Sequence, residues 1–361
     1  MGDLILPSLE IRNFRGFQHL QIERLGRVNL IVGKNNIGKT SLLEAIQLYA
    51  QKGDFSSVIR MLEVREEGVL YGNVLGALKY LFYGRKEIAT DTQPIEIGPI
   101  DSPEKMLHLT ISWDVTEFKD GKLQTRPLQP EDSPTNAILS PRFNQHIEGQ
   151  TISFPLGAAL PSNILKPDVK DINSFYITSD GLDRRHLGDL WDKVALRERE
   201  AEDDVLNAIR IAAPGIERLY FIGDARDGKN RIPVVRVADI EEPLPLRSLG
   251  DGMQHILGLA LALVNAKDGF LLIDEIESGI HYSALFELWQ LIFHVARRLN
   301  IQIFATTHSW DCLEAFQKAA VEDEHEEALL IRLNNKEDGI DVTLIDEKIL
   351  GAVVRTQMEV R

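Results

Sequence analysis

The first residues of this chain that could perform chemistry form a glycine-rich loop. Its eight residues match G-x-x-x-x-G-K-[ST] at every fixed position, and they are Gly33, Lys34, Asn35, Asn36, Ile37, Gly38, Lys39 and Thr40. Glycine lets backbone N–H groups approach an anion, and a helix starting here adds the positive end of its dipole. We therefore expect this loop, extended to Ser41, to bind the phosphates of ATP. Lys39 is expected on the β- and γ-phosphates, and the Thr40 hydroxyl on Mg²⁺.

Two carboxylates and a histidine follow apolar runs much later in the chain. The run Phe270–Ile273 ends in Asp274 and Glu275, and His308 follows the run Ile301–Thr306. A buried carboxylate pair without a cation is costly, whereas beside Mg·ATP both have a role. Asp274 is predicted to bind Mg²⁺ directly or through water, and Glu275 to orient or deprotonate the attacking water. His308 is predicted to contact the γ-phosphate; the alternative is an ordinary histidine of the core or surface.

A second glycine-rich helix start precedes these strands, at Ser248, Gly250, Asp251 and Gly252. Its backbone could hold an anion as the phosphate loop does. One chain cannot easily place two such helix starts on one nucleotide. We therefore expect a homodimer in which Gly250–Gly252 of each subunit faces the γ-phosphate bound by Lys39 of the other. The alternative is a plain helix cap.

The remaining pattern predicts the elements that position these residues. Strands and helices alternate in the second half, which favours a parallel, doubly wound core. In the first half, strands are expected at 9–13 and 20–22, around a turn at Phe14–Phe17 with exposed aromatic and basic groups. Two strands ahead of the loop strand suggest a mixed sheet. Asn13, Phe14 and Arg15 could contact adenine and ribose, or this segment could be an ordinary hairpin.

We expect one domain spanning 1–361, with a helical insertion at 53–102 and an irregular or helical lobe at 116–215. Helical spacing marks 55–82, and alternation marks a strand at 107–115. Prolines make the segment that follows this strand irregular. Further helices are expected at 180–195 and 198–213, hairpins at 219–237 and 329–344, and a closing helix at 348–361.

Composition narrows the class of protein. The content of 44% hydrophobic and 26% charged residues is ordinary for a globular chain. No apolar run approaches the roughly 18 residues of a membrane span, and the N-terminus lacks a signal-peptide pattern. We therefore expect a cytoplasmic protein without membrane contact. The single cysteine, Cys312, excludes an internal disulfide and a cysteine-based zinc cluster. A net charge of −15 argues against a surface broadly coated for DNA, but leaves room for a local basic patch.

Together these segments resemble the ABC-type ATPase heads of the RecF/SMC class, and most of all stand-alone AAA-family ATPases similar to the OLD ATPase domain. The resemblance rests on Leu-Glu-Ile-Arg-Asn-Phe-Arg-Gly-Phe from Leu9, the Walker A loop, Ser-Leu-Gly-Asp-Gly-Met-Gln from Ser248, the Walker B Leu-Leu-Ile-Asp-Glu, the D-loop-like Ile276–His281 and Ala-Thr-Thr-His-Ser around His308. It implies a P-loop NTPase with an ABC-head-like mixed or parallel sheet flanked by helices. It also implies Mg²⁺-dependent ATP hydrolysis and a dimer that sandwiches ATP.

The chain departs from that class in informative ways. Aligned on its second glycine, the ABC signature Leu-Ser-Gly-Gly-Gln falls on Leu249–Met253, so the serine hydroxyl is missing unless Ser248 replaces it. Sustained heptads of an SMC coiled coil and a following Toprim nuclease are not expected. The resemblance implies an ATPase that acts beside an effector nuclease or another protein, in prokaryotic anti-phage defence or DNA maintenance. The alternative is a nucleotide-gated scaffold that hydrolyses ATP slowly or not at all. Little supports a nuclease within this chain, because no second acidic cluster with metal spacing stands out.

Overall fold

The computed structural model describes residues 4–68, 74–119, 122–129, 131–132, 137–157, 169–197, 199–223, 231–322, 328–337 and 339–346. The main elements are, in chain order, β1 (Leu9–Phe14), β2 (Phe17–Ile22), β3 (Val28–Val32), α1 (Lys39–Ala50), α2 (Phe55–Val64), α3 (Val74–Leu78), β4 (Ile95–Gly98), β5 (Leu107–Lys119), β6 (Lys122–Pro127), β7 (Ile138–Ile147), β8 (Gln150–Pro155), β9 (Ser174–Ile177), α4 (Arg184–Ala195), α5 (Arg199–Ala212), β10 (Ile216–Gly223), β11 (Arg231–Val237), β12 (Leu244–Pro245), α6 (Gly252–Asn265), β13 (Phe270–Ile273), α7 (Leu285–Arg298), β14 (Gln302–Thr306), α8 (Trp310–Glu322), β15 (Ala328–Lys336) and β16 (Gly339–Asp346). Short 3₁₀ turns include η3 (Tyr83–Arg85) and η5 (Leu246–Leu249).

The central sheet has the strand order β16-β15-β3-β14-β13-β9. Its strands run parallel except for β16, which pairs antiparallel with β15. All residues of β3, β13 and β14 are buried, as expected for parallel strands covered on both faces. The carboxyl ends of these three strands meet at one edge of the sheet, so the segments that follow them can form one site.

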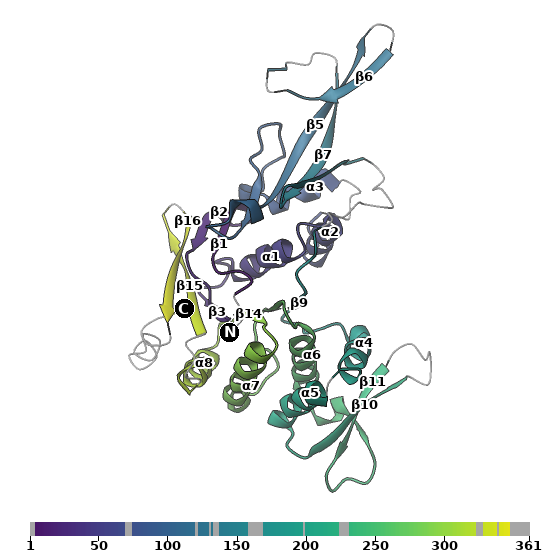
Figure 1. Ribbon diagram of the computed structural model, residues 1–361, viewed down its shortest axis with the longest axis vertical. Helices are drawn as coiled ribbons and strands as arrows, with labels where there is room; N and C mark the ends of the chain where they lie inside the picture. The colour runs from purple at the N-terminus through teal and green to yellow at the C-terminus, as the bar shows by residue number, and fades with distance from the viewer. Residues whose placement is uncertain are drawn as a thin grey trace.

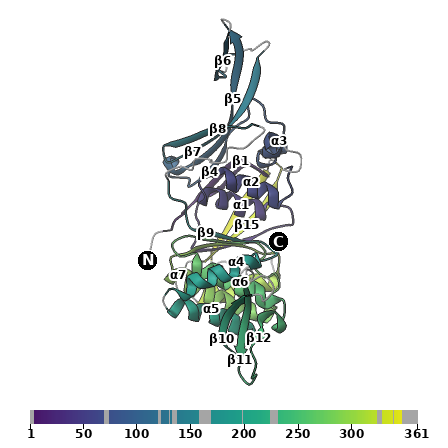
Figure 2. The ribbon, with the colours of Figure 1, turned by 90° about the vertical axis from the view of Figure 1, so that its right-hand side faces the viewer.

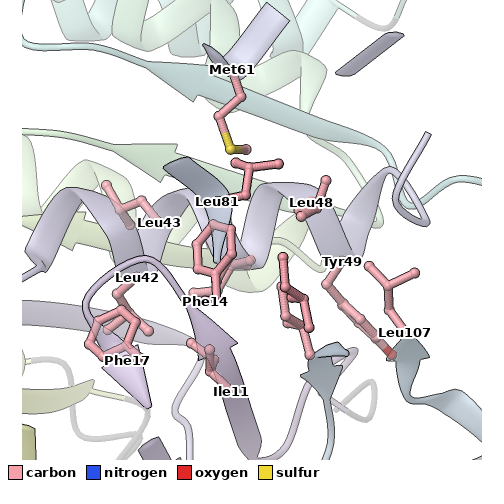
Figure 3. Packing of buried hydrophobic residues seen from close by; sticks show 14 of the residues in the cluster. Ile11, Phe14, Phe17, Leu42, Leu43, Leu48, Tyr49, Met61, Leu81 and Leu107 are labelled. Carbon is pink, nitrogen blue, oxygen red and sulfur yellow. The ribbon is translucent and has the colours of Figure 1, made fainter. Parts of the chain in front are cut away.

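Helix α1 lies between the central sheet and a second, antiparallel sheet (Figure 1). Leu42, Leu43 and Leu48 of α1 belong to a core that also holds Ile11 of the first hairpin and Phe304 of β14. Figure 3 shows Ile11 and the neighbouring aromatic residues of that hairpin packed against this helix. The phosphate-loop helix is thus fixed from both sides.

The second sheet has the order β2-β1-β4-β5-β7-β8, with β6 paired to the far half of β5. Strands β5, β6 and β7 extend beyond the body as an arm (Figure 1). The expectation of an irregular segment after residue 115 is therefore wrong where β6 and β7 form, because antiparallel pairing orders that segment. The insertion expected at 53–102 does contain helices α2 and α3, but it also contributes β4 to this sheet. The helical part of 116–215 is α4 and α5.

Helices α4, α5 and α6 form a lobe that is covered by the small sheet β10-β11-β12 (Figure 2). Its core includes Trp191, Val205, Leu257 and Val235. The expected hairpin at 219–237 is confirmed as β10 and β11. Helix α6 links this lobe to the central sheet, because its Leu259 and Leu263 pack with α7 and β13.

Two expectations about the first hairpin are wrong. The turn at Phe14–Phe17 was expected to expose its aromatic and basic groups, yet Phe14, Arg15 and Phe17 are buried. The aromatic rings pack on α1, and carboxylates neutralise Arg15. Strands β1 and β2 also belong to the antiparallel sheet, so the mixed character of the central sheet comes from β16 instead.

The C-terminal part confirms the hairpin expected at 329–344, with Ile331 opposite Leu344. The closing helix expected at 348–361 lies outside the described residues. Within the described part of the chain, no helix is both long and apolar enough to cross a membrane.

Candidate nucleotide-binding and catalytic site

The glycine-rich loop joins β3 to α1 in a geometry that requires glycine. Gly33 and Gly38 have φ angles of 148° and 108°. A Cβ at Gly33 would lie 2.8 Å from the Leu333 carbonyl oxygen, and one at Gly38 would lie 3.0 Å from Phe17. Helix α1 begins directly at Lys39. The loop therefore presents its backbone and a helix N-terminus to one cavity, as a phosphate-binding loop does.

Lys39 is held over this loop. Its Nζ donates to the carbonyl oxygens of Gly33, at 2.8 Å, and Lys34, at 3.3 Å. Burial lowers the pKa of the Lys39 ammonium, and the charges of Asp274, Glu275 and Glu277 oppose this shift. The ammonium is thus partly desolvated and surrounded by carboxylates, where a polyphosphate could take over as its partner.

Thr40 and Asp274 meet at the expected magnesium position. The Thr40 hydroxyl donates to Asp274 Oδ2 at 2.8 Å, across 234 residues of sequence. Thr306, at the end of β14, donates its hydroxyl to the other oxygen of Asp274. A hydroxyl and a carboxylate are hard oxygen donors that suit Mg²⁺, which takes most of its remaining ligands from phosphates and water. The residues present therefore fit Mg²⁺ bound together with a nucleotide.

Glu275 and His308 flank the same cavity from neighbouring strand ends. The Glu275 N–H donates to the Thr306 hydroxyl at 2.8 Å, and its backbone adopts a φ of 53°. Its carboxylate is 42% exposed, and Oε1 lies 3.6 Å from His308 Nδ1. Glu275 is therefore open to an attacking water, whereas the Asp274 oxygens are engaged by threonines. The two carboxylates have different environments and can serve different roles.

These residues line one cavity of about 590 Å³. Its lining comprises Arg15, Gly16, Asn35, Asn36, Ile37, Gly38, Lys39, Thr40, Ser41, Arg65, Arg85, Asp274, Glu275, His308 and Ile340. The structure thus brings the predicted loop, carboxylates and histidine together. Gly33 and Lys34 line a neighbouring cavity of about 250 Å³ on the other side of the loop, which His308 also borders.

Of the three residues suggested for adenine and ribose, Phe14 is buried in the core, and Asn13 and Arg15 have different surroundings from each other. Asn13 donates to the carbonyl of Gln93 and lines another hollow. Arg15 does border the nucleotide cavity, but its guanidinium is buried between Glu44, at 2.7 Å, and Glu67, at 2.8 Å. Burial raises the pKa of the Glu44 carboxyl against the opposing effect of the neighbouring arginines. Arg15 therefore fastens α1 to the first hairpin.

The signature-like segment lies away from this cavity in the single chain. Ser248 lies within η5, and neither Gly250 nor Asp251 borders the nucleotide cavity. Asp251 is 76% exposed and pairs with Arg247 at 2.7 Å. A Cβ at Gly252 would lie only 2.0 Å from the Gly279 carbonyl oxygen, so the start of α6 packs tightly against the D-loop-like segment.

Several residues at the site were not predicted from the sequence. The sequence pattern could have indicated Thr306, because this residue ends an apolar strand close to His308. It could also have indicated Glu277, as a third carboxylate just after the Asp274-Glu275 pair. It could not have indicated Arg65, Arg85 and Ile340, because they reach the cavity from a helix end, a 3₁₀ turn and an edge strand.

This fold and this site are those of a P-loop ATPase domain. The chain belongs to the family described as "AAA domain, putative AbiEii toxin, Type IV TA system", whose model matches residues 125–311. A model described as "AAA ATPase domain" matches residues 5–148. The two matches together include both the Walker A loop and the Walker B strand.

Individual proteins that are similar to this chain support its assignment to the P-loop ATPases. An ATP/GTP phosphatase of Helicobacter pylori is 24% identical over 337 residues, which cover 86% of this chain and 87% of that protein. The DNA replication and repair protein RecF of Bacillus mycoides is 35% identical over 77 residues, or 21% of this chain and 20% of RecF. A crystal structure of an SMC head bound to the C-winged helix domain of ScpA superimposes with a TM-score of 0.51 at 14% identity, covering 94% of this chain and 97% of that one, which shows a shared fold.

Proposed function

We propose that this protein hydrolyses ATP with Mg²⁺ and that nucleotide binding drives its dimerisation. The observation that carries the proposal is the meeting of Lys39, Thr40, Asp274, Glu275 and His308 around one cavity. The glycine loop and Lys39 bind the phosphates, and Thr40 and Asp274 hold the metal. Bound Mg²⁺ would neutralise charge on the transferred phosphoryl group.

Glu275 is the proposed base for the attacking water, since its carboxylate is open to the cavity whereas that of Asp274 is engaged. His308 is proposed to contact the γ-phosphate from the end of β14. The similarity to a protein named an ATP/GTP phosphatase over most of both chains supports hydrolysis rather than binding alone.

The exposed signature-like segment supports a head-to-tail homodimer. One chain does not bring Gly250 or Asp251 to its own cavity. In the proposed dimer, Ser248, Gly250, Asp251 and Gly252 of one subunit close over the nucleotide bound by the other, which completes both sites by two-fold symmetry. The absence of a serine at the second signature position makes Ser248 the candidate hydroxyl.

The cycle is proposed to control a partner in the cytoplasm, either an effector nuclease or another protein, in anti-phage defence or DNA maintenance. The toxin–antitoxin description of the family supports a defence role, and the partial similarity to RecF supports DNA contact. The helical insertion around residues 55–82 and the segment 116–215, to which β6 and β7 of the arm belong, are the proposed partner contacts. The arm exposes apolar side chains at Phe118, Leu123 and Ile138.

The test is the isosteric change Glu275→Gln, which removes the base and keeps the site's shape. Phosphate release should fall by about 10²- to 10⁴-fold, the usual contribution of a general base, while ATP binding persists. Light scattering with Mg·ATP should then report a stable dimer. Unchanged turnover would remove Glu275 from its role. If the wild-type chain assembles with ATP but releases no phosphate, the scaffold alternative replaces the ATPase. Parallel assays with added single- or double-stranded DNA would show whether DNA stimulates turnover.

A further inference from the structure

Glu277 is a recessed carboxylate that contacts His308 in two places. The main-chain N–H of His308 donates to Glu277 Oε1 at 3.0 Å. The ring Nδ1 of His308 lies 3.1 Å from the same oxygen, closer than its 3.6 Å from Glu275 Oε1. The Glu277 side chain is only 11% exposed and does not border the nucleotide cavity. It therefore holds His308 from behind, while Glu275 faces the cavity.

The double contact determines how the imidazole is presented. The main-chain hydrogen bond fixes the backbone where β14 ends, and the side-chain contact fixes the ring. A carboxylate at Nδ1 favours the tautomer with the proton on that nitrogen, as it does for histidines held by a carboxylate at metal sites. The other ring nitrogen, Nε2, is then the one left to face the cavity.

The second oxygen of Glu277 points to a role beyond packing. Oε2 is buried and accepts no hydrogen bond from the part of the chain that the structure describes. A buried carboxylate oxygen without a donor costs free energy, so its retention calls for a compensating role. Lys39 lies within electrostatic range of Glu277. The charge of Glu277 also acts on Cys312, because burial first, and then this charge, raise the pKa of the Cys312 thiol to about 12, so the thiol stays neutral.

We propose that Glu277 is a positioning residue that aligns His308 for the chemical step. This inference rests on the proposed ATPase function, because it assigns His308 a partner within that site. Glu277 does not touch the nucleotide cavity, so it affects the rate of hydrolysis through His308 and leaves nucleotide binding unchanged. A purely structural carboxylate would instead affect the amount of folded protein and would act independently of His308.

The experiment compares Glu277→Ala, Glu277→Gln, His308→Ala and the double variant Glu277→Ala/His308→Ala in the full chain. We expect Glu277→Ala to lower kcat by about tenfold or more, as loss of an orienting partner commonly does, with KM for ATP unchanged. Glu277→Gln should recover part of the loss, because its amide oxygen can still accept from the His308 N–H. In the His308→Ala background, Glu277→Ala should cause no further loss. Glu314→Ala is the matched control, since Glu314 pairs with Lys318 on the surface of α8 and should behave as wild type.

Three results would overturn the inference: wild-type kcat in both Glu277 variants, additive losses in the double variant, or a loss that follows the melting temperature. If Glu277→Ala does not fold, Glu277→Gln and its combination with His308→Ala carry the same test. Failure of the ATPase proposal has a separate signature, because the wild-type chain would then release no phosphate. When Glu275→Gln is inactive and the Glu277 variants match wild type, only the positioning role is wrong.

Discussion

The phosphate-binding edge and the signature-like segment are two glycine-rich helix starts with opposite surroundings. At the first, Thr40, Asp274 and Thr306 form a continuous set of hydrogen bonds that joins the start of α1 to the ends of β13 and β14. At the second, Asp251 is largely exposed, and a Cβ placed on Gly250 would meet no atom within 4 Å. The first helix start belongs to a hydrogen-bonded site within its own chain, and the second is exposed at the surface.

We infer from this difference that one protomer carries an organised half of the proposed active site. The groups proposed to bind metal and phosphate and to act as base are preorganised by the fold, so nucleotide binding should need a single chain. The signature-like segment lies outside this cavity and is joined to the D-loop-like segment by the close approach of Gly252 to Gly279. Turnover, in contrast to binding, should need a second copy.

The largest expected effect comes from removing the cation of the organised half. Lys39→Ala should lower both ATP affinity and phosphate release by about a hundredfold or more, because a charge-assisted contact to two phosphates is lost. Lys34→Ala is the control, since that side chain is exposed and borders the neighbouring cavity. Calorimetric titration with Mg·ATP measures binding. Equal losses in the two variants would show that the loop acts only through its general positive charge.

Mixing two inactive variants tests whether the two halves act between subunits. Lys39→Ala disables the phosphate half, and Asp251→Trp blocks the exposed signature-like half at a position with room for a large side chain. A mixed dimer keeps one site with both halves intact, so an equimolar mixture should regain about a quarter of wild-type turnover. Phosphate release is measured as a function of mixing ratio. A mixture as inactive as its components would argue against the shared site.

A smaller effect is expected at Arg85, which lines the cavity from η3 and forms no ion pair with any residue in the described ranges. Its main chain lies near the first hairpin, since the preceding turn contacts Arg15 through the Leu81 carbonyl at 2.7 Å. We therefore expect its guanidinium to contact the bound nucleotide. Arg85→Ala should raise KM for ATP by about tenfold with kcat unchanged, as expected for loss of uniform binding.

Lys86→Ala is the matched control for Arg85, because Lys86 is also exposed but faces the hollow lined by Asn13. Its KM should stay at the wild-type value. Equal KM increases in both variants would indicate a general electrostatic effect. A fall in kcat for Arg85→Ala would instead place its guanidinium at the transferred phosphate.

The smallest effect on turnover is expected from Gly252→Ala. This variant tests how tightly the signature-like segment packs against the D-loop-like segment. The added methyl group would overlap the Gly279 carbonyl, so the free energy of unfolding should fall by about 1–3 kcal/mol, the usual cost of overpacking. ATP binding should persist in the folded fraction. Gly149→Ala is the control, because Gly149 has open space around it and its φ of 77° costs only backbone strain. Urea titration measures both. A larger loss at Gly149 would show that the close contact is readily relieved.

Much of the fold could be predicted because its signals are local. The apolar runs of β3, β13 and β14 and the hairpin of β15 and β16 follow directly from residue pattern. Strands β6 and β7 could not, because the prolines of this region obscure the alternation and both strands depend on pairing with β5. The burial of the Phe14–Phe17 turn also depends on a distant element, since α1 and its Glu44 supply the cover and the countercharge.

The sequence by itself determined the residues on which the proposed chemistry depends: a loop that only glycine can form, a lysine and threonine at its end, and strands followed by carboxylates and a histidine. These follow from consecutive residues, because backbone freedom and strand burial are properties of short segments. Only the tertiary structure decided which side chains meet. The register of strands far apart in the chain joins Thr40 to Asp274, places Glu277 behind His308, and turns Asn13 away from the nucleotide cavity. Such contacts depend on the positions of several elements at once, and no single segment specifies them.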